Sequence, residues 1–466
     1  MSVRILKDDI VKFFDDEGHL VATLFWGDRI EEISENRFQL LTTKWNPETY
    51  EYDLVEREVS AKKQPLFQEE GVFKARFIDV GQGDAAIFEN RDGGLTLIDG
   101  GMGPWIRRYL HRAFAYLLAE GPIPLDAIVV THGDADHYDG LTELLTRKVG
   151  GKPLVTTKRI FHNGLTKASG EELDALGEIV EEGPNGRPWI VGLVDDITEV
   201  DDAELNRPFK AWKKALVALK ERVPDLEVRR IAVGDDGAFD FLGVDTTVLG
   251  PITHEVEGKP ALEYLKGPRG GFEIGHTING HSIVLKLDVG KVRILFGADL
   301  NIESEERLLA HAEENGISLE SEVLKVPHHG SHEFVPTLLE QIAPVVSIVS
   351  SGDQAIVAGS DHIHPRAGLV GALGKYSRKS VERPLVYVTE MVAYFRPVNR
   401  ALEIRDDGNV PLRNAHEKTT FGIVHVRTDG RRVLVATHSG EAKKKESYVF
   451  TIGDDGKITF SDPKTK

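Results

Sequence analysis

A dense run of histidine and aspartate, His132-Gly133-Asp134-Ala135-Asp136-His137, follows the apolar segment 127–130 after a single threonine, Thr131. Four potential metal ligands therefore lie within six positions behind a predicted buried strand. Folds of the α/β class place their sites in such loops, because side chains converge above the carboxyl ends of the strands. This spacing favours two metal ions that share one site. The competing interpretation is a solvated acidic turn that carries incidental histidines.

The same residue types recur after several other predicted strands. They are Asp99, Asp299, the pair His328-His329, and His364. A single aspartate after a strand is usually a turn former, but several such junctions in one chain point to a shared site. The chain has no cysteine, so any metal ligands must be His, Asp, Glu or Asn side chains.

The pattern along the chain predicts three parts. Residues 1–70 form a small β-rich N-terminal domain, and 71–383 form the domain that carries the histidine and aspartate junctions. Within it, 165–235 is a polar, acidic and helix-leaning insertion or lid. Residues 384–466 are a β-rich C-terminal region. The strand–strand–helix–strand order that begins at Val72 predicts an α/β sandwich.

The net charge of −18, from 57 basic and 75 acidic residues, argues mildly against a protein that coats nucleic acid. It does not exclude an enzyme that cuts nucleic acid, because a metal ion supplies local positive charge. No segment approaches the ~18 consecutive apolar residues of a membrane-spanning helix. Charges occupy the place where a signal peptide needs an apolar core. We therefore expect a cytoplasmic protein that does not contact a membrane.

A set of motifs occurs in a fixed order between residues 72 and 375. The motifs are Phe77-Ile78-Asp79-Val80-Gly81-Gln82-Gly83-Asp84, Leu97-Ile98-Asp99-Gly100-Gly101, the run 132–137, Asn279-Gly280-His281-Ser282-Ile283-Val284-Leu285, Phe296-Gly297-Ala298-Asp299-Leu300, Val323-Leu324-Lys325-Val326-Pro327-His328-His329-Gly330-Ser331, and His364-Pro365. This set resembles the metallo-β-lactamase fold and, within it, the soluble hydrolase domain of ComEC-type DNA-uptake proteins. The stretch 160–245 has no counterpart. The resemblance implies an αββα sandwich, to which the β-rich N-terminal domain and C-terminal extension are added.

The resemblance implies two divalent metal ions per chain. His132 and Asp134 are expected to bind the first ion, and Asp136 and His137 the second. Asp134 stands where most of the superfamily has a histidine. A carboxylate there makes the site harder, so Mn²⁺ competes with Zn²⁺.

The remaining metal-site residues follow from the same resemblance. Asp299 is expected to bridge both ions, and His364 to be the last ligand of the second ion. Asp99 is expected to hold the ligand loop, and Asp84 to support the floor of the site. The Gly81-Gln82-Gly83 segment before Asp84 is a weak phosphate-loop signal, and a tight turn between two strands is the favoured interpretation.

The histidine that completes the first ion's shell in the family has no clear counterpart here. Asn279 and His281, just before the strand that leads to Asp299, are the two candidates. His281 is equally compatible with a strand residue that faces solvent.

These residues predict a metal-dependent hydrolase, most readily a phosphodiesterase or nuclease, that uses a hydroxide held by two metal ions. Asp136 would orient the hydroxide, and His328 or His329 would assist the leaving group. Lys325 and Arg366, each next to a motif, are expected near the phosphates of the substrate, and single-stranded nucleic acid is favoured over duplex.

Two alternatives stay open. The first is an acyl hydrolase that acts on lactones, esters or thioesters, because the metal centre alone does not select phosphodiesters. The second is a non-catalytic binding protein whose fold is stabilised by a structural metal ion, although structural zinc sites mostly use cysteine. The terminal domains are expected to serve recognition or association, with no partner named by the sequence.

Overall fold

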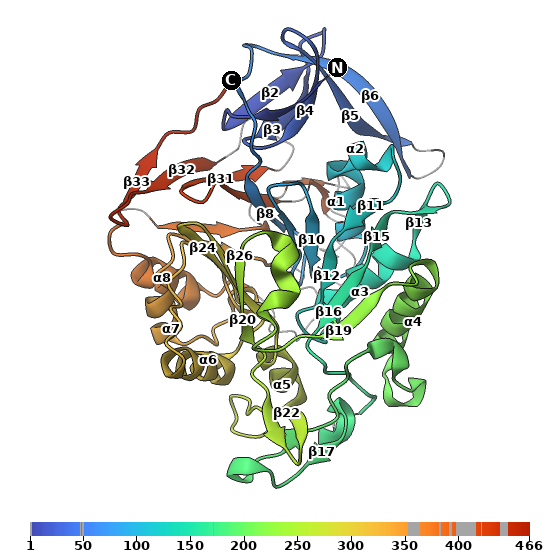
Figure 1. Cartoon of the computed structure of the whole chain (residues 1–466), viewed down its shortest axis with the longest axis vertical. Coiled ribbons are helices and arrows are strands. Elements are labelled where there is room, and N and C mark those ends of the chain that lie inside the picture. The colour runs from blue at the N-terminus through green and yellow to red at the C-terminus, as the bar shows by residue number, and fades with distance from the viewer. Residues whose placement is uncertain are drawn as a thin grey trace, which may run out of the picture.

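The computed structural model describes most of the chain. Residue 383, at the expected end of the hydrolase domain, and parts of the expected C-terminal region lie outside the described residues. In the described part, two large β-sheets face each other and helices cover their outer sides (Figure 1). The predicted αββα sandwich is confirmed. The described residues are 2–46, 48, 51–170, 172–352, 364–381, 384–390, 394–397, 416–420, 422–438 and 446–466.

The two sheets of the sandwich are formed by strands from distant parts of the chain. The first has the order β19 (Glu227–Arg230), β16 (Arg159–His162), β12 (Ala127–Val129), β10 (Leu95–Ile98), β9 (Ala86–Glu89), β8 (Phe73–Ile78), β30 (Ile423–Thr428), β31 (Arg432–His438), β32 (Ser447–Ile452) and β33 (Ile458–Ser461). The second has the order β20 (Asp245–Gly250), β23 (Val284–Val289), β24 (Val292–Phe296), β25 (Val323–Lys325), β26 (Val346–Val349) and β27 (Leu385–Val388). Because β30 pairs antiparallel with β8, the C-terminal strands extend the first sheet.

Helices lie outside each sheet. Figure 1 shows α6 (Ile302–Glu314), α7 (Pro336–Ile342) and α8 (Ala367–Tyr376) on one side of the sandwich. On the other side lie α1 (Trp105–Ala113), α2 (Ala115–Leu118), α3 (Ala135–Thr146) and α4 (Arg207–Arg222), while α5 (Ile274–Gly280) lies below the sheets. None of the helices in the described ranges is long and apolar enough to cross a membrane.

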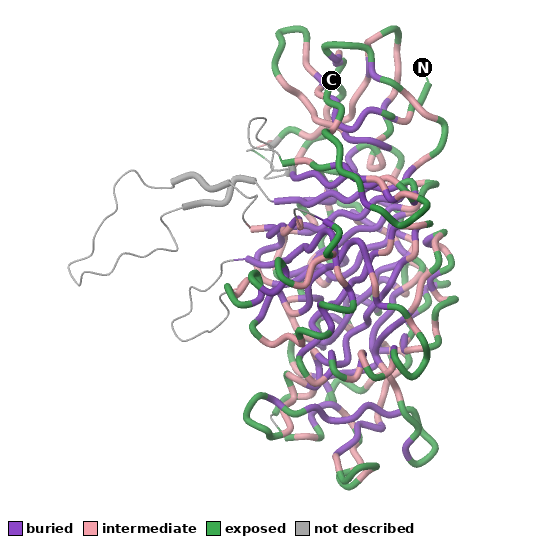
Figure 2. Tube along the Cα trace, turned by 90° about the vertical axis from the view of Figure 1, so that its left-hand side faces the viewer, coloured by how far each residue is buried: buried purple, intermediate pink, exposed green. Residues whose placement is uncertain are grey.

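The core follows the period of two that β-strands impose on their side chains. In β9, Phe88 points into the layer between the sheets, whereas Ile87 packs under the helices. In β24, Ile294 enters the same central layer and Leu295 packs under the opposite helices. Both faces of the central strands are therefore buried, which gives these strands their continuous apolar sequences (Figure 2).

The N-terminal region folds as a separate seven-stranded sheet at one end of the sandwich. Its order is β3 (Leu20–Phe25), β2 (Ile10–Phe14), β6 (Glu51–Ala61), β5 (Arg37–Asn46), β4 (Arg29–Ser34), β1 (Ser2–Leu6) and β7 (Phe67–Gln68). The C-terminal end of the chain returns to this sheet. The amide of Ile10 donates to the Lys464 carbonyl at 3.2 Å, and the amide of Lys466 donates to the Ile10 carbonyl at 3.0 Å.

The expected insertion 165–235 is less helical than its sequence suggests. Its described residues contain one α-helix, α4, together with short 3₁₀ turns and strands. Its last strand, β19, pairs parallel with β16 at the edge of the first sheet. A small sheet projects from the sandwich, in which β17 (Ile179–Val180) and β18 (Trp189–Ile190) of this insertion pair with β22 (Lys259–Glu263) and β21 (His254–Val256), which follow it in the chain.

A buried charge cluster joins the N-terminal sheet to the sandwich. Glu89 accepts hydrogen bonds of 2.6 Å from both Lys74 and Arg76. Lys74 also lies 3.6 Å from Asp28 of the N-terminal sheet, and Arg427 of β30 lies 2.8 Å from the same carboxylate. Burial alone would raise the pKa of Glu89, but Lys74 and Arg76 lower it from 4.5 to about 2. The junction therefore depends on ionised carboxylates that neutralise buried cations.

We expect Glu89→Gln to lower the free energy of unfolding at pH 7 by about 3–5 kcal/mol, because Lys74 and Arg76 lose a buried counter-charge. The wild-type advantage is complete above pH 4.5, and it disappears as the pH falls towards 2, where Glu89 becomes protonated in the folded state. Urea unfolding of both proteins at a series of pH values measures this difference. The exposed Glu120→Gln is the control, and equal destabilisation by both substitutions would contradict the prediction.

Candidate metal centre

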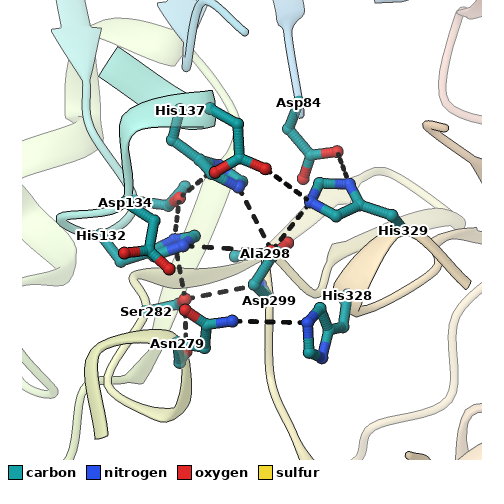
Figure 3. A network of polar contacts seen from close by, with 12 residues as sticks. Asp84, His132, Asp134, His137, Asn279, Ser282, Ala298, Asp299, His328 and His329 are labelled. Carbon is teal, nitrogen blue, oxygen red and sulfur yellow. Dashed lines mark hydrogen bonds and ion pairs between the residues drawn. The ribbon is translucent and has the colours of Figure 1, made fainter. Parts of the chain in front are cut away.

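The predicted ligand residues meet at one edge of the sandwich, where strands of both sheets end. His132 follows β12, and Asp136 and His137 lie in the first turn of α3. Asp299 follows β24 of the second sheet, and His329 lies in a 3₁₀ turn after β25. Figure 3 shows the side chains of His132, His137, Asp299 and His329 directed towards one another.

The Asp299 carboxylate is the centre of the cluster. Its Oδ2 atom lies 2.9 Å from His329 Nε2, 3.2 Å from His137 Nε2 and 4.0 Å from His132 Nε2. Burial alone would raise the pKa of Asp299, but His329 and His137 hold it well below its ordinary value. The carboxylate is therefore ionised and faces three imidazoles, as expected of a residue that binds cations.

Each histidine is oriented by a contact to its other ring nitrogen. His137 Nδ1 lies 2.8 Å from Asp99, which also accepts hydrogen bonds from the backbone and hydroxyl of Thr131. His329 Nδ1 donates to the Ser350 carbonyl at 3.1 Å, and His132 Nδ1 lies 3.0 Å from the Thr131 hydroxyl. All three rings consequently present Nε2 to the same space. This is the arrangement by which carboxylates and carbonyls orient metal-binding histidines.

The floor of the cluster contains a second carboxylate and a buried lysine. Asp84 Oδ1 lies 3.3 Å from His329 Nδ1, and the Lys325 ammonium pairs with Asp84. Lys325 also donates to the Ala298 carbonyl at 2.9 Å. Burial would raise the pKa of Asp84, but Lys325 and His329 lower it. The Lys325 side chain is fully buried and neutralises Asp84 and Asp299 beneath the cluster. The prediction that Lys325 contacts a substrate phosphate is therefore wrong.

The donor set fits divalent cations. Ligand atoms of His132, His137 and Asp299 lie within 4.8 Å of one another, as do those of Asp136, His137 and His329. Within the described residues, His132 Nε2 and Asp299 Oδ1 are buried and have no hydrogen-bond partner. Burial and His137 hold the pKa of His132 well below its ordinary value, which keeps its imidazole neutral as a metal ligand requires.

Asp134, a predicted ligand of the first ion, lies beside these ligand groups and has protein partners. Asn279 donates to its Oδ2 at 2.8 Å in the amide orientation that pairs donor with acceptor, and Lys167 Nζ lies 3.8 Å from its Oδ1. Burial and the neighbouring Asp136 raise the pKa of Asp134 to about 6, while Lys167 opposes this shift. Asn279 also lies 3.4 Å from His328 Nε2, so it connects Asp134 to the predicted catalytic loop.

The other predicted residues divide into two groups. His364 lies with the cluster, since its ring centroid is 6.2 Å from that of His328 and 6.4 Å from that of His329. Arg366 lies next to it as the N-cap of α8, and its amide donates to the Gly330 carbonyl. His281 points away, because its Nε2 donates to the Glu263 carbonyl at 2.7 Å. The structure therefore places Asn279, and not His281, beside the ligand cluster.

The sequence predicted that His328 or His329 assists the leaving group, whereas the structure brings His329 into the ligand cluster. The doubled histidine was the available signal, but it does not show which of the two rings faces Asp299. Lys167 and Ser282 were not predicted. Ser282 lies inside a recognised motif and its hydroxyl is 3.3 Å from His132 Nδ1, whereas Lys167 lies in the unmatched stretch and gave no signal.

Asp299→Asn should lower the metal affinity at least about 100-fold, since three imidazoles lose the carboxylate on which they converge. Hydrolytic activity should fall with it, while circular dichroism should remain unchanged. Atomic emission spectrometry of the purified protein measures the bound metal. His311→Ala, a change on α6 away from the cluster, should retain full metal content. Unchanged metal content in the Asp299 variant would contradict the assignment.

Comparisons with known proteins place these observations in a family. No curated protein sequence matches the chain significantly. The solved structure of a diphosphatase of the PhnP family is 13% identical, with 63% of this chain and 94% of that chain covered and a TM-score of 0.26. A variant of the CmlA β-hydroxylase is 11% identical, with 69% and 52% covered and a TM-score of 0.29. At these scores neither likeness informs the fold or the activity.

The family model of the metallo-beta-lactamase superfamily matches residues 78–352. That range contains almost all of the ligand cluster, from Asp84 to His329. None of the comparisons tests the finer resemblance to ComEC-type proteins, which stays a prediction. Since the match covers more than half of the chain, the protein belongs to the metallo-beta-lactamase superfamily of hydrolases.

Proposed function

We propose that this chain is a metal-dependent phosphodiesterase that cleaves single-stranded nucleic acid. The observation that carries the proposal is the composition of the centre. Three carboxylates, Asp84, Asp136 and Asp299, each lie within 4.8 Å of histidine ring nitrogens of the cluster. A set so rich in carboxylate oxygen suits hard divalent ions such as Mn²⁺ as well as Zn²⁺, and these are ions that enzymes use on phosphate esters.

The residues expected to hold the metal are His132, Asp136, His137, Asp299 and His329, and we propose two ions, with Asp134 completing the first site. When bound, divalent ions lower the pKa of a coordinated water and neutralise negative charge on a phosphate. Asp136 is well placed to orient the attacking water. Its carboxylate lies 3.6 Å from His329 Nε2, and that ring and His137 keep its pKa below the ordinary value although burial opposes them.

His328 is the proposed leaving-group residue. Its side chain contacts Asn279 through Nε2, and its buried Nδ1 has no hydrogen-bond partner among the described residues. Burial lowers the pKa of His328, so the ring is neutral at neutral pH, and its single N–H would have to leave Asn279 to donate to the departing oxygen. A hydrogen bond to the departing oxygen would stabilise negative charge there.

Two cations near the cluster support a phosphate-containing substrate. Lys167 is half-buried beside Asp134, and Arg366 is half-buried beside the His328-His329 turn. Each can contact a phosphate on either side of the scissile bond. The overall charge of −18 opposes a polyanionic substrate, so local cations of this kind are required for binding.

The test is a comparison of substrates with the purified chain in Mn²⁺ and in Zn²⁺. We expect cleavage of single-stranded oligonucleotides to exceed cleavage of the same sequence as a duplex, and lactones and thioesters to react slowly. Rapid turnover of a lactone or thioester, with no phosphodiester cleaved under either metal, would favour the acyl-hydrolase alternative.

Arg366→Glu should weaken cleavage of the single strand and reduce the log–log salt dependence by roughly one unit, because one phosphate contact is lost. Hydrolysis of a small uncharged ester should not change, since no phosphate is involved. Lys375→Glu, at the other end of α8, is the matched charge reversal. Equal effects of the two variants would show that only general electrostatics, and no contact near the centre, is at work.

A further inference from the structure

We propose that His276 of α5 is a positioning residue, and that its contact with Glu333 holds α5 against the turn that carries His328 and His329. The proposal rests on the proposed function for the role of His328 in leaving-group departure, and it names the residue that prepares this role. His276 Nε2 lies 3.1 Å from the Glu333 carboxylate, and its Nδ1 lies 3.1 Å from Glu273 at the start of the helix. Both ring nitrogens of His276 therefore face carboxylates, and neither contact involves a ligand of the cluster.

The contact between His276 and Glu333 is a charge-assisted hydrogen bond that is only partly exposed. The side chain of His276 is 20% exposed, and that of Glu333 is 11% exposed. The hydrogen bond to Glu333 raises the pKa of His276 above its ordinary value, although burial opposes this shift. The same hydrogen bond lowers the pKa of Glu333. Both shifts favour the charged forms, and a charge-assisted hydrogen bond is stronger than one between neutral groups.

Helix α5 is too short to be stable without tertiary contacts. It has seven residues, Ile274–Gly280, and two of them are glycines. Helices of this length are marginal in isolation, and glycine lowers the helix propensity further. The side chain of the N-cap residue, Glu273, forms no capping hydrogen bond. The position of α5 therefore depends on the contacts that its side chains make with neighbouring segments.

The turn that faces α5 also requires support from its neighbours. His328 and His329 adopt φ angles of 47° and 52°, in the left-handed region that disfavours residues with a side chain. Two such residues in succession persist only where surrounding contacts determine their conformation. Glu305 of α6 accepts a hydrogen bond from the Val335 amide. Helix α5 holds the same segment from another side through Glu333.

The effect of His276 reaches His328 through Asn279. These two residues of α5 lie three positions apart, so both face the 328–333 segment from one side of the helix. Asn279 donates to Asp134 in the amide orientation that pairs donor with acceptor. Its oxygen then lies 3.4 Å from His328 Nε2 and accepts the N–H of that ring (Figure 3). The position of α5 thereby determines which nitrogen of His328 carries the proton and where this N–H points before the leaving oxygen departs.

This arrangement gives His276 an effect that depends on the leaving group. A nitrophenolate is a weak base and departs without help. The alkoxide of a nucleoside is a strong base, and it needs a hydrogen bond as the bond from phosphorus to oxygen breaks. Loss of a fixed direction of the His328 ring should therefore slow only the departure of the alkoxide.

The kinetic experiment compares a dinucleotide with bis(p-nitrophenyl) phosphate as substrates of the full chain in Mn²⁺. His276→Ala should lower kcat on the dinucleotide at least about tenfold with KM unchanged, and kcat on the nitrophenyl ester less than about twofold. Glu333→Gln should act in the same way, and the double variant should be no slower than either single variant, because the two groups act as one pair. His276→Gln keeps a donor for Glu333 and should restore most of kcat. Equal losses on both substrates, or loss of bound metal, would overturn the proposal.

The matched control is His19→Ala. His19 Nδ1 lies 3.4 Å from Glu17 in an exposed histidine–carboxylate pair between β2 and β3 of the N-terminal sheet. Loss of this pair should leave kcat on both substrates unchanged, because exposed ion pairs contribute little and this one does not touch α5.

A second measurement does not require catalysis. Nitrogen NMR of the metal-free protein, isotope-labelled at its histidine nitrogens, reports which ring nitrogen of His328 is protonated, and His328→Gln identifies the signals. The unmodified chain should show one neutral tautomer with the proton on Nε2, as the hydrogen bond to Asn279 requires. His276→Ala and Glu333→Gln should show the averaged signals of two tautomers. A fixed Nε2–H tautomer in both variants would overturn the proposal.

The outcomes for His276 and for the proposed function are separable. A chain that cleaves no phosphodiester, but in which His276→Ala releases the His328 tautomer, retains the positioning role and loses the proposed function. A chain that cleaves the dinucleotide, and in which His276→Ala slows both phosphodiesters equally, retains the proposed function and loses the positioning role.

Discussion

The convergence of three imidazoles on the buried carboxylate of Asp299 is the interaction on which the rest of the site depends. A buried carboxylate is costly unless positive charge or hydrogen-bond donors surround it. His132 and His137 come from the first sheet side, and Asp299 and His329 come from the second. The cluster therefore forms only when the two sheets are assembled in register. Neighbouring groups lower the free-energy cost of burying Asp299, because they hold the histidines in place around it. Asp99 contacts the ring of His137, and the Ser350 carbonyl contacts the ring of His329.

Two glycines of this region allow backbone segments around the metal centre to pack closely against one another. A Cβ atom added to Gly83 would lie 1.9 Å from the carbonyl oxygen of Asp136, and one added to Gly140 would lie 2.1 Å from that of Gly100. Gly83 also adopts a φ of +100°, which disfavours other residues. The Gly81-Gln82-Gly83 segment lies in a bend of the connection between β8 and β9, and its glycines let the loop before Asp84 pack on α3. Its glycines serve the metal centre through packing.

Much of the site could be predicted from the histidines and aspartates that follow predicted strands. Their residue types and their positions after apolar runs can be read from the sequence without knowledge of the tertiary structure. The α/β sandwich and the meeting of His132, His137 and Asp299 follow from that pattern, whereas the αββα layering was implied by the resemblance to the metallo-β-lactamase fold. The direction of individual side chains does not. Lys325 occupies a motif position that suggested substrate contact, but it is buried against Asp84, a partner distant in sequence. His281 likewise turns to the Glu263 carbonyl, a contact that no local pattern reveals.

The buried charges at the junction fix the position of the N-terminal sheet on the sandwich. Asp28 of that sheet is neutralised by Lys74 and Arg427 of the sandwich, and separating the two units would expose or unpair these groups. The junction is thereby held in one arrangement. The β5–β6 hairpin, which carries Tyr52, accordingly keeps a fixed position against Arg112 of α1. A small domain held in this way forms a rigid wall beside α1, so any molecule that binds against it would lose little binding free energy to domain motion.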